Sequence, residues 1–182
     1  MKEQVIGLFW GSDTGATEGI AQELEKILSQ KFQIDSHELH DSGVSKIASY
    51  DYLILGLSTW YDGELQSDWD GKFNEFCELD FTGKTVAVFG LGDQYGYPEW
   101  FVDGMGIIAE QVAHAGGRLI GHWPTDNYEY DQSKAEMKPG WFYGLAIDEE
   151  NQGERTTQRL KTWTDQLTEE FKKRISASSI LT

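Results

Sequence analysis

Hydrophobic residues in this chain form short apolar runs that alternate with stretches of helical periodicity. Apolar runs typical of buried strands occur at residues 5–10, 51–57, 84–89, 118–121 and 145–147, and residues 32–37 alternate as in an edge strand. Between them, apolar residues recur every three or four positions around residues 20–28, 69–77, 101–112 and 160–171. Strands that alternate with helices indicate an α/β fold, in which helices cover both faces of a parallel sheet.

The number of strand–helix units predicts a doubly wound, five-stranded parallel sheet of order 2-1-3-4-5. In this topology, ligands bind beyond the carboxyl ends of the strands, at the switch point between strands 1 and 3. The turns at residues 11–17, 58–64 and 92–98 follow strands 1, 3 and 4. We therefore expect these three turns to converge on one crevice.

The chain has 182 residues, which suits one domain; we expect residues 1–175 to form it and residues 176–182 to be a frayed tail. No apolar run approaches the length of a membrane span, and the first residues lack the apolar region of a signal peptide. The single cysteine, Cys77, agrees with a reducing compartment and falls beside Phe73 and Phe76 at helical spacing. These features predict a cytoplasmic protein in which Cys77 is a buried structural thiol.

The net charge of −16, from 15 basic and 31 acidic residues, argues against a nucleic-acid or anionic-membrane surface. It predicts partners with basic faces and association rates that fall with salt, although acidity that serves only solubility is an open alternative. The four histidines are scattered without metal-binding spacing, and no Ser-His-Asp arrangement is evident. We therefore expect neither a metal site nor catalytic residues.

The turn after the first strand, residues 11–18, has the composition of a phosphate-binding loop. It carries three hydroxyls, two glycines and no cation, and it leads into a helix whose first N–H groups lack partners. Gly15 is followed by Ala16-Thr17, which excludes a Walker A loop, and the glycine spacing does not fit a dinucleotide fingerprint. On its own, the turn leaves open whether it binds a phosphate or whether Thr14 merely caps the helix.

Two large aromatic residues, Trp60 and Tyr97, lie in the other two predicted turns. Two such rings can hold a planar heterocycle between them, although packing of Trp60 on its own domain is the alternative. Acidic residues flank both turns: Asp62, Glu64, Asp68, Asp93 and Glu99. A phosphate loop, an aromatic pair and an acidic rim together indicate a site for flavin mononucleotide (FMN).

The motifs Gly11–Glu18, Ser58–Trp60 with Gly63–Leu65, and Gly90–Tyr97 resemble those of the long-chain flavodoxins. Trp123–Tyr130 and Gly144–Gln152 fit the same pattern, so that the resemblance covers roughly residues 3–171. It implies a flavodoxin-like sheet with a long-chain insertion, residues 122–143, in strand 5. Gly121–Thr125 and Glu99–Phe101 are most similar to the second flavodoxin type of enteric-like proteobacteria.

The resemblance implies a low-potential one-electron carrier that binds FMN non-covalently and shuttles electrons between redox enzymes, without being an enzyme itself. Residues 12–17 would hold the phosphate, Trp60 and Tyr97 would stack on the flavin, and other turn residues would contact the ribityl chain and ring edge. Ala16, Tyr61 and Asp62 depart from the more frequent residues of the family. The expected cofactor-binding residues are Ser12, Asp13, Thr14, Gly15, Ala16, Thr17, Ser58, Thr59, Trp60, Tyr61, Asp62, Gly63, Gly92, Asp93 and Tyr97.

The expected partners are basic-faced redox proteins, such as a ferredoxin/flavodoxin-NADP reductase, and low-potential acceptor enzymes. We expect the protein itself to be a monomer. The main alternative is an FMN-dependent NAD(P)H:quinone oxidoreductase on the same fold. Residues 104–109 match the spacing G-x-G-x-x-A but fall within a helical stretch, so we interpret the match as accidental. A phosphoacceptor receiver domain is rejected because its acidic residues and lysine are missing from the turns.

Overall fold

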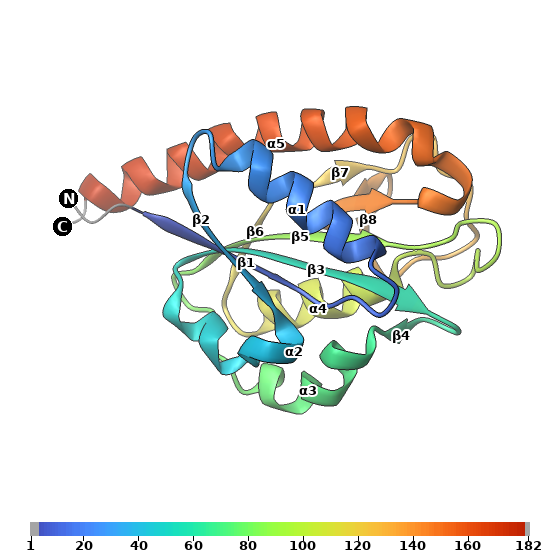
Figure 1. Cartoon of the computed structure of the whole chain (residues 1–182), viewed down its shortest axis with the longest axis horizontal. Helices are drawn as coiled ribbons and strands as arrows, with labels where there is room; N and C mark the ends of the chain where they lie inside the picture. The colour runs from blue at the N-terminus through green and yellow to red at the C-terminus, as the bar shows by residue number, and fades with distance from the viewer. Residues whose placement is uncertain (1–3, 181–182) are drawn as a thin grey trace.

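The computed structural model describes residues 4–180, and its centre is a seven-stranded sheet with helices on both faces (Figure 1). The sheet contains β1 (Val5–Trp10), β2 (Gln33–Glu38), β3 (Tyr52–Trp60), β4 (Glu64–Leu65), β5 (Thr85–Leu91), β6 (Arg118–Ile120) and β10 (Leu145–Ile147). The helices are α1 (Ala16–Leu28), α2 (Leu39–Ser42), α3 (Ser67–Cys77), α4 (Asp103–His114) and α5 (Glu149–Ile180), with a 3-10 helix, η1 (Ser45–Ser49). Among the described helices, none is long and apolar enough to cross a membrane.

The main strands run parallel in the order β2-β1-β3-β5-β10, which confirms the predicted doubly wound fold. The predicted fifth strand consists of two pieces that both pair with β5. β6 lies beside the first half of β5, with Thr85 opposite Arg118, and β10 lies beside the second half, with Leu145 opposite Phe89. The chain between these pieces therefore interrupts the strand without displacing its second half from the sheet.

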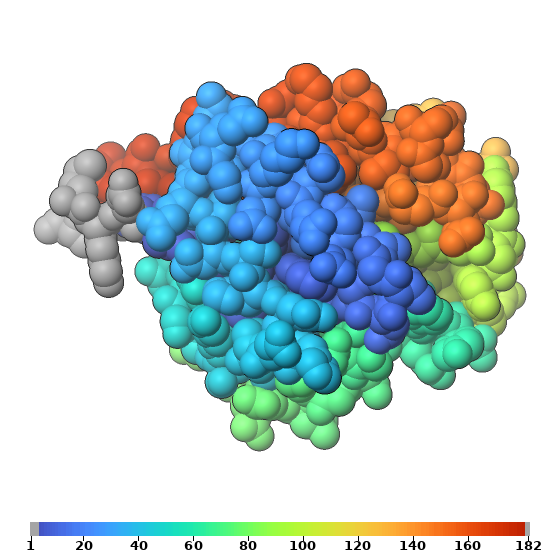
Figure 2. All heavy atoms as spheres, in the orientation of Figure 1, coloured from blue at the N-terminus to red at the C-terminus, as the bar shows by residue number. Residues whose placement is uncertain are grey.

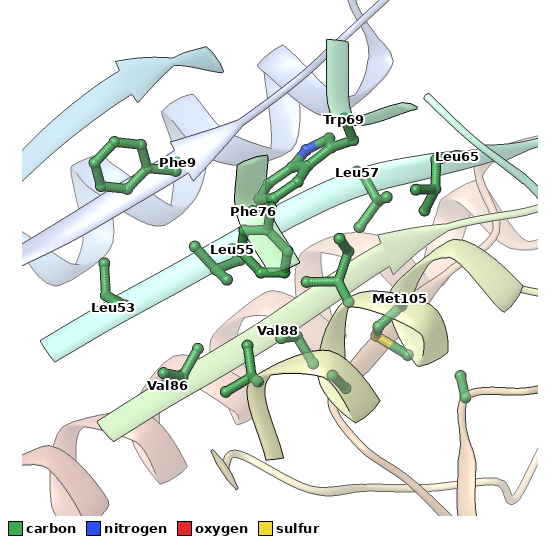
Figure 3. Packing of buried hydrophobic residues seen from close by; sticks show 14 of the residues in the cluster. Phe9, Leu53, Leu55, Leu57, Leu65, Trp69, Phe76, Val86, Val88 and Met105 are labelled. Carbon is green, nitrogen blue, oxygen red and sulfur yellow. The ribbon is translucent and has the colours of Figure 1, made fainter. Parts of the chain in front are cut away.

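Each face of the sheet is covered by its own hydrophobic core. On one face, the side chains of β3 and β5 pack with Trp69 and Phe76 of α3 and with Met105 of α4 (Figure 3). On the other face, α1 and α5 lie side by side and cover the alternate strand residues, including Ile54 and Phe89. β1, β3 and β5 are buried on both faces, which explains why they read as continuous apolar runs.

The segment between β6 and β10, which has no clear hydrophobic periodicity, forms a small antiparallel sheet. Its strands are β7 (Trp123–Pro124), β9 (Trp141–Phe142) and β8 (Glu136–Lys138), in that order. Phe142 is fully buried in the core that also contains α4. The insertion is thus anchored to the domain by its own apolar side chains.

Cys77 lies at the end of α3, and the predicted C-terminal tail lies at the end of α5. Cys77 is exposed, so the prediction of a buried thiol is wrong: α3 buries Trp69 and Phe76, and Cys77 lies one residue further around the helix. The C-terminal helix α5 continues to Ile180. Residues 176–180 of the predicted frayed tail are therefore helical, and residues 181–182 lie outside the described residues.

Candidate functional site

A cavity lies at the carboxyl ends of β1, β3 and β5, where the three predicted turns converge. In Figure 2, surfaces from the first turn (blue), the residues after β5 (yellow-green) and the start of α5 (orange) gather on the right-hand side of the molecule. The cavity is lined by Thr14, Ala16, Ser58, Thr59, Trp60, Tyr61, Leu91, Gly92, Asp93, Tyr97, Trp100, Glu149 and Glu150. The expected convergence is therefore present, and nine of these lining residues were expected from the sequence.

The first turn delivers the N-terminus of α1 to this cavity. Gly15 precedes the helix in a left-handed conformation (φ 91°), and no side chain caps the helix. The alternative role for Thr14 as a helix cap is therefore not realised, and Thr14 lines the cavity instead. The Gly15 N–H donates to Ser12 Oγ at 3.0 Å, which closes the turn on itself just before Ala16, the first residue of α1, which lines the cavity.

The second turn is joined to the first and to α4 by hydroxyl groups. Thr17, fully buried in α1, lies within hydrogen-bond distance of Ser58, with 2.6 Å between the two side-chain oxygens. Thr59 Oγ1 accepts the Gly104 N–H at 2.9 Å. Both hydroxyls of β3 are thus held in place by protein groups.

The third turn is held by a buried carboxylate at the start of α5. Asp148 is fully buried and accepts hydrogen bonds from the Gln94 backbone and side-chain nitrogens, the latter at 2.7 Å, and from Asn151. Gln94 Oε1 in turn accepts the Glu129 N–H of the insertion at 2.7 Å. This network fastens the turn after β5 to two other parts of the chain.

Asp93 in the same turn is an acceptor for three donors. Its Oδ1 accepts from the N–H groups of Tyr95 and Gly96 and from the Asn151 side chain, at 3.1, 2.7 and 2.8 Å. Partial burial alone would raise the pKa of Asp93, but these hydrogen bonds outweigh it and hold the pKa below its ordinary value. Asp93 is therefore a fixed negative charge at the cavity wall.

Two aromatic rings, Trp60 and Tyr97, line the cavity, and Tyr97 is 42% exposed. Trp60 Nε1 is buried and has no hydrogen-bond partner among the described residues. Tyr61, which follows Trp60, has a positive φ of 42° and is 62% exposed. Large aromatic surface exposed beside a cavity is available for contact with a flat ligand.

Six expected site residues are not among the residues that line the cavity: Ser12, Asp13, Gly15, Thr17, Asp62 and Gly63. Four lining residues were missed: Leu91, Trp100, Glu149 and Glu150. Trp100 could have been found as a further aromatic just beyond the third turn. Glu149 and Glu150 could have been found because they follow the predicted strand at residues 145–147, whose carboxyl end lies at the same edge of a parallel sheet. No cationic side chain lines the cavity, and three acidic ones do.

The acidic rim differs in one position from the expectation. Asp68 is largely buried, and its carboxylate accepts from Gln66 Nε2 at 2.9 Å and contacts His40 Nδ1 at 3.1 Å. It is therefore engaged inside the protein and does not serve as a free rim charge. Asp62, Glu64 and Glu99 are exposed as expected.

The glycines of the G-x-G-x-x-A match lie inside a helix. Gly104 and Gly106 are buried within α4; a Cβ at Gly106 would lie 2.3 Å from the Lys134 backbone, so these glycines permit close packing. The match of residues 104–109 to a dinucleotide fingerprint therefore has a packing explanation. Within residues 4–180, no cluster of three or more His, Cys, Asp or Glu side chains could hold a metal ion.

Comparison with known sequences gives consistent matches. The family described as Flavodoxin matches residues 8–163. A flavodoxin of Nostoc sp. is 46% identical over 169 residues, which cover 91% of this chain and 96% of that protein. Flavodoxin 1 of Escherichia coli (strain K12) is 45% identical over 167 residues, covering 92% of this chain and 94% of that protein.

Solved structures agree with the sequence comparison. The crystal structure of Fusobacterium nucleatum flavodoxin, bound to flavin mononucleotide, matches with a TM-score of 0.87 and 34% identity. The match covers 92% of this chain and 98% of that one. The oxidised flavodoxin 2 of Bacillus cereus matches with a TM-score of 0.69 and 25% identity, over 91% of this chain and 98% of that chain.

The low pKa of Asp93 predicts a pH-dependent contribution to stability. Because the folded pKa lies below the unfolded value of about 3.9, the stabilisation is present above that value and is lost as pH falls through the folded pKa. We expect Asp93→Asn to lower the free energy of unfolding at pH 7 and to differ progressively less from the original protein toward pH 3. Urea unfolding of both ligand-free proteins across this range measures the difference; a difference that is independent of pH would contradict the prediction.

Proposed function

The chain belongs to the flavodoxin family, and we propose that it is a one-electron carrier that binds FMN non-covalently. The observation that carries the proposal is the cavity, in which the uncapped N-terminus of α1 and two aromatic rings lie on turns from three adjacent strands. Bound FMN would supply the redox chemistry, while the protein orients the group and tunes its potential. Flavodoxins are electron-transfer proteins and not enzymes, and nothing in the described chain favours the quinone reductase alternative.

The residues present fit the phosphate end of FMN. The first N–H groups of α1 lack intrahelical partners and carry the positive end of the helix dipole, which favours an anion. Thr14 adds a hydroxyl at the cavity wall, and Gly15 has no heavy atom within 4 Å of a Cβ position. We propose that residues 12–17 bind the phosphate through neutral donors, with Ala16 contributing only its backbone N–H.

The residues present also fit the flavin end. We propose that Trp60 and Tyr97 stack on the two faces of the ring, and that Ser58, Thr59, Gly92 and Asp93 contact the ribityl chain and the ring edge. Tyr61, Asp62 and Gly63 would form the turn beside the ring, where Tyr61 and Gly63 both have positive φ. Leu91, Trp100, Glu149 and Glu150 join this proposed site because they line the same cavity.

The charges around the cavity support a low reduction potential. Reduction adds negative charge to a flavin, and nearby fixed negative charge disfavours that change. Asp93, Glu149 and Glu150 line the cavity, and no lining residue offers a compensating cation. The acidic wall would therefore make the bound FMN a stronger reductant than free FMN.

We further propose that the chain is a long-chain flavodoxin, with residues 1–175 as its single domain. The split of the fifth strand into β6 and β10, with the small sheet between them, supports the long-chain assignment. The motifs at residues 99–101 and 121–125 favour the second type of enteric-like proteobacteria. The single cysteine, an exposed thiol, favours a reducing cytoplasm.

We propose basic-faced redox proteins as partners, namely an NADP-linked reductase as electron donor and low-potential acceptor enzymes. We also propose that this chain is a monomer. The net charge of −16 and the exposed carboxylates beside the cavity support this choice. Like-charged nucleic acid and anionic membrane surfaces are disfavoured by the same charge.

The proposed function predicts a yellow protein. The purified chain should release one FMN per protein on denaturation, and reductive titration should take up electrons one at a time. The visible spectrum and chromatography of the released flavin measure this. Recovery of FAD, or a colourless protein that fails to bind added FMN, would contradict the proposal.

The proposed stacking predicts the effect of removing each ring. Trp60→Ala and Tyr97→Ala should each weaken FMN binding by about 1–3 kcal/mol, because each substitution exposes flavin surface that the ring would cover. Flavin titration of the ligand-free protein with fluorescence detection gives the dissociation constants. Trp141→Ala removes a 41% exposed ring outside the cavity lining and is the matched control. Equal affinities in all four proteins would exclude the stacking.

The acidic surface predicts salt-sensitive electron uptake. Steering between exposed charges is screened over about 8–10 Å near physiological salt, so the association rate with an NADP-linked reductase should fall steeply as salt rises. Neutralising Asp62, Glu64 and Glu99 together should reproduce the effect of high salt, whereas the same change at exposed Glu23, Glu75 and Glu169 should not. Stopped-flow reduction across a salt series tests this, and rates independent of salt would mean that the charge serves solubility alone.

A further inference from the structure

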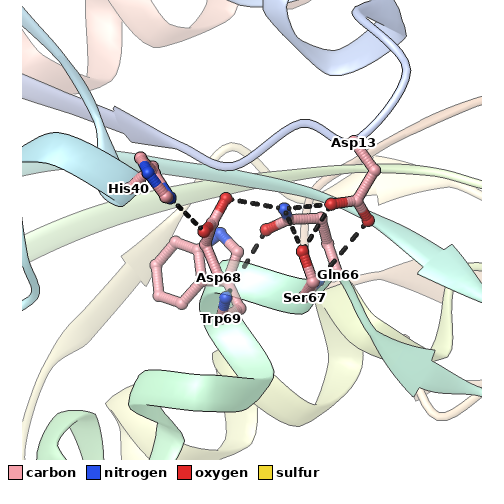
Figure 4. A network of polar contacts seen from close by, with 6 residues as sticks. All are labelled: Asp13, His40, Gln66, Ser67, Asp68 and Trp69. Carbon is pink, nitrogen blue, oxygen red and sulfur yellow. Dashed lines mark hydrogen bonds and ion pairs between the residues drawn. The ribbon is translucent and has the colours of Figure 1, made fainter.

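A polar network with a buried centre connects the proposed phosphate turn, residues 12–17, to the start of α3 (Figure 4). Its centre is Gln66, whose side chain is fully buried between strand ends. The Gln66 amide nitrogen lies 3.0 Å from Asp13 Oδ1 and 2.9 Å from Asp68 Oδ2, and it donates to both. Gln66 therefore bridges two carboxylates from different parts of the chain.

The other atoms of Gln66 fix its position. Its Oε1 accepts the Trp69 N–H at 3.4 Å, which caps α3, and it packs against the backbone of the first turn. A Cβ at Gly11 would lie 2.0 Å from this oxygen, so only glycine allows the turn to approach so closely. The amide is thus held with its oxygen toward Gly11 and α3 and its nitrogen toward Asp13.

Asp13 belongs to the proposed phosphate turn, and its carboxylate is bound by side chains at the start of α3. Besides Gln66, it accepts from Ser67 Oγ at 2.5 Å. Burial alone would raise the pKa of Asp13, yet the hydrogen bonds from Ser67 and Gln66 outweigh it and keep the pKa below its ordinary value. Asp13 is therefore an anchor for the turn and does not line the cavity.

We infer that Gln66 is a positioning residue whose buried amide holds Asp13, and with it the turn at residues 12–17, in the conformation that receives the FMN phosphate. The inference rests on the proposed function. In the absence of a cation at the cavity, phosphate affinity depends on how well several backbone N–H groups are aligned, and alignment must be imposed from behind the turn. Gln66 would thereby determine the preference for FMN over riboflavin, which lacks the phosphate.

The test compares FMN and riboflavin binding in variants of the network. Gln66→Glu keeps the size and the acceptor for Trp69 but replaces the donor by a carboxylate that faces Asp13 and Asp68. Asp13→Ala removes the anchor from an exposed position and covers the case in which Gln66→Glu fails to fold. Gln158→Glu, with the same charge change on an exposed part of α5, is the control.

We expect FMN affinity to fall by about tenfold or more in Gln66→Glu and Asp13→Ala, with riboflavin affinity within about twofold of the original protein. Hydrogen exchange at the amides of residues 12–17 should accelerate in both ligand-free variants. The exchanged pair Gln66→Glu with Asp13→Asn moves the amide donor to position 13 and should recover part of the lost FMN affinity. Gln158→Glu should change neither affinity.

The outcomes separate the inference from the proposed function. Equal losses of FMN and riboflavin affinity would mean that Gln66 has only a structural role. Unchanged FMN affinity in the variants would also overturn the inference. So would an exchanged pair that binds FMN more weakly than Gln66→Glu alone. If the unsubstituted protein fails to bind FMN, the proposed function itself fails. If it binds FMN and the variants bind it equally well, only the role of Gln66 is excluded.

Discussion

The site depends on the parallel pairing of β1, β3 and β5, three strands buried on both faces. Trp10 pairs with Gly56, and Ser58 pairs with Leu91, so the carboxyl ends of the three strands stop at one edge of the sheet. A slip of one residue in any strand would exchange its two apolar faces and also shift its turn along the edge. Core packing and site geometry are therefore set by the same register.

The charge of the protein opposes the binding of an anion such as the FMN phosphate at this cavity. The cavity wall holds three carboxylates and no cation, in a protein of net charge −16. In the proposed site, attraction of the phosphate would therefore come from short-range dipoles, namely the first N–H groups of α1 and neighbouring hydroxyls, which act within the first helical turn. The carboxylates that repel the phosphate would also lower the reduction potential of the flavin. Weak long-range attraction of the phosphate and a low reduction potential would therefore have the same cause.

Sequence alone predicted the sheet and the convergence of turns because buried parallel strands read as apolar runs and their topology fixes which ends meet. It could not predict contacts that depend on side-chain packing between distant segments. Gln66 and Asp13 are 53 residues apart, and nothing in either local sequence indicates the bond. The burial of Cys77 was predicted wrongly for a similar reason. Helical spacing locates the buried face of a helix only to within one residue, and at the end of α3 a shift of one residue separates a buried side chain from an exposed one.

Each of the three turns at the cavity is held from behind by a buried polar group. Gln66 holds the first through Asp13, the Gly104 N–H holds the second through Thr59, and Asp148 holds the third through Gln94. A loop that ordered only on binding would lose affinity to the entropy of ordering, which can reach about 1–2 kcal/mol per residue. Gln66, Gly104 and Asp148 do not line the cavity, whereas Thr59, which accepts the Gly104 N–H, belongs both to an anchor and to the lining. In the proposed site, Asp13 would likewise support the turn at residues 12–17 without lining the cavity.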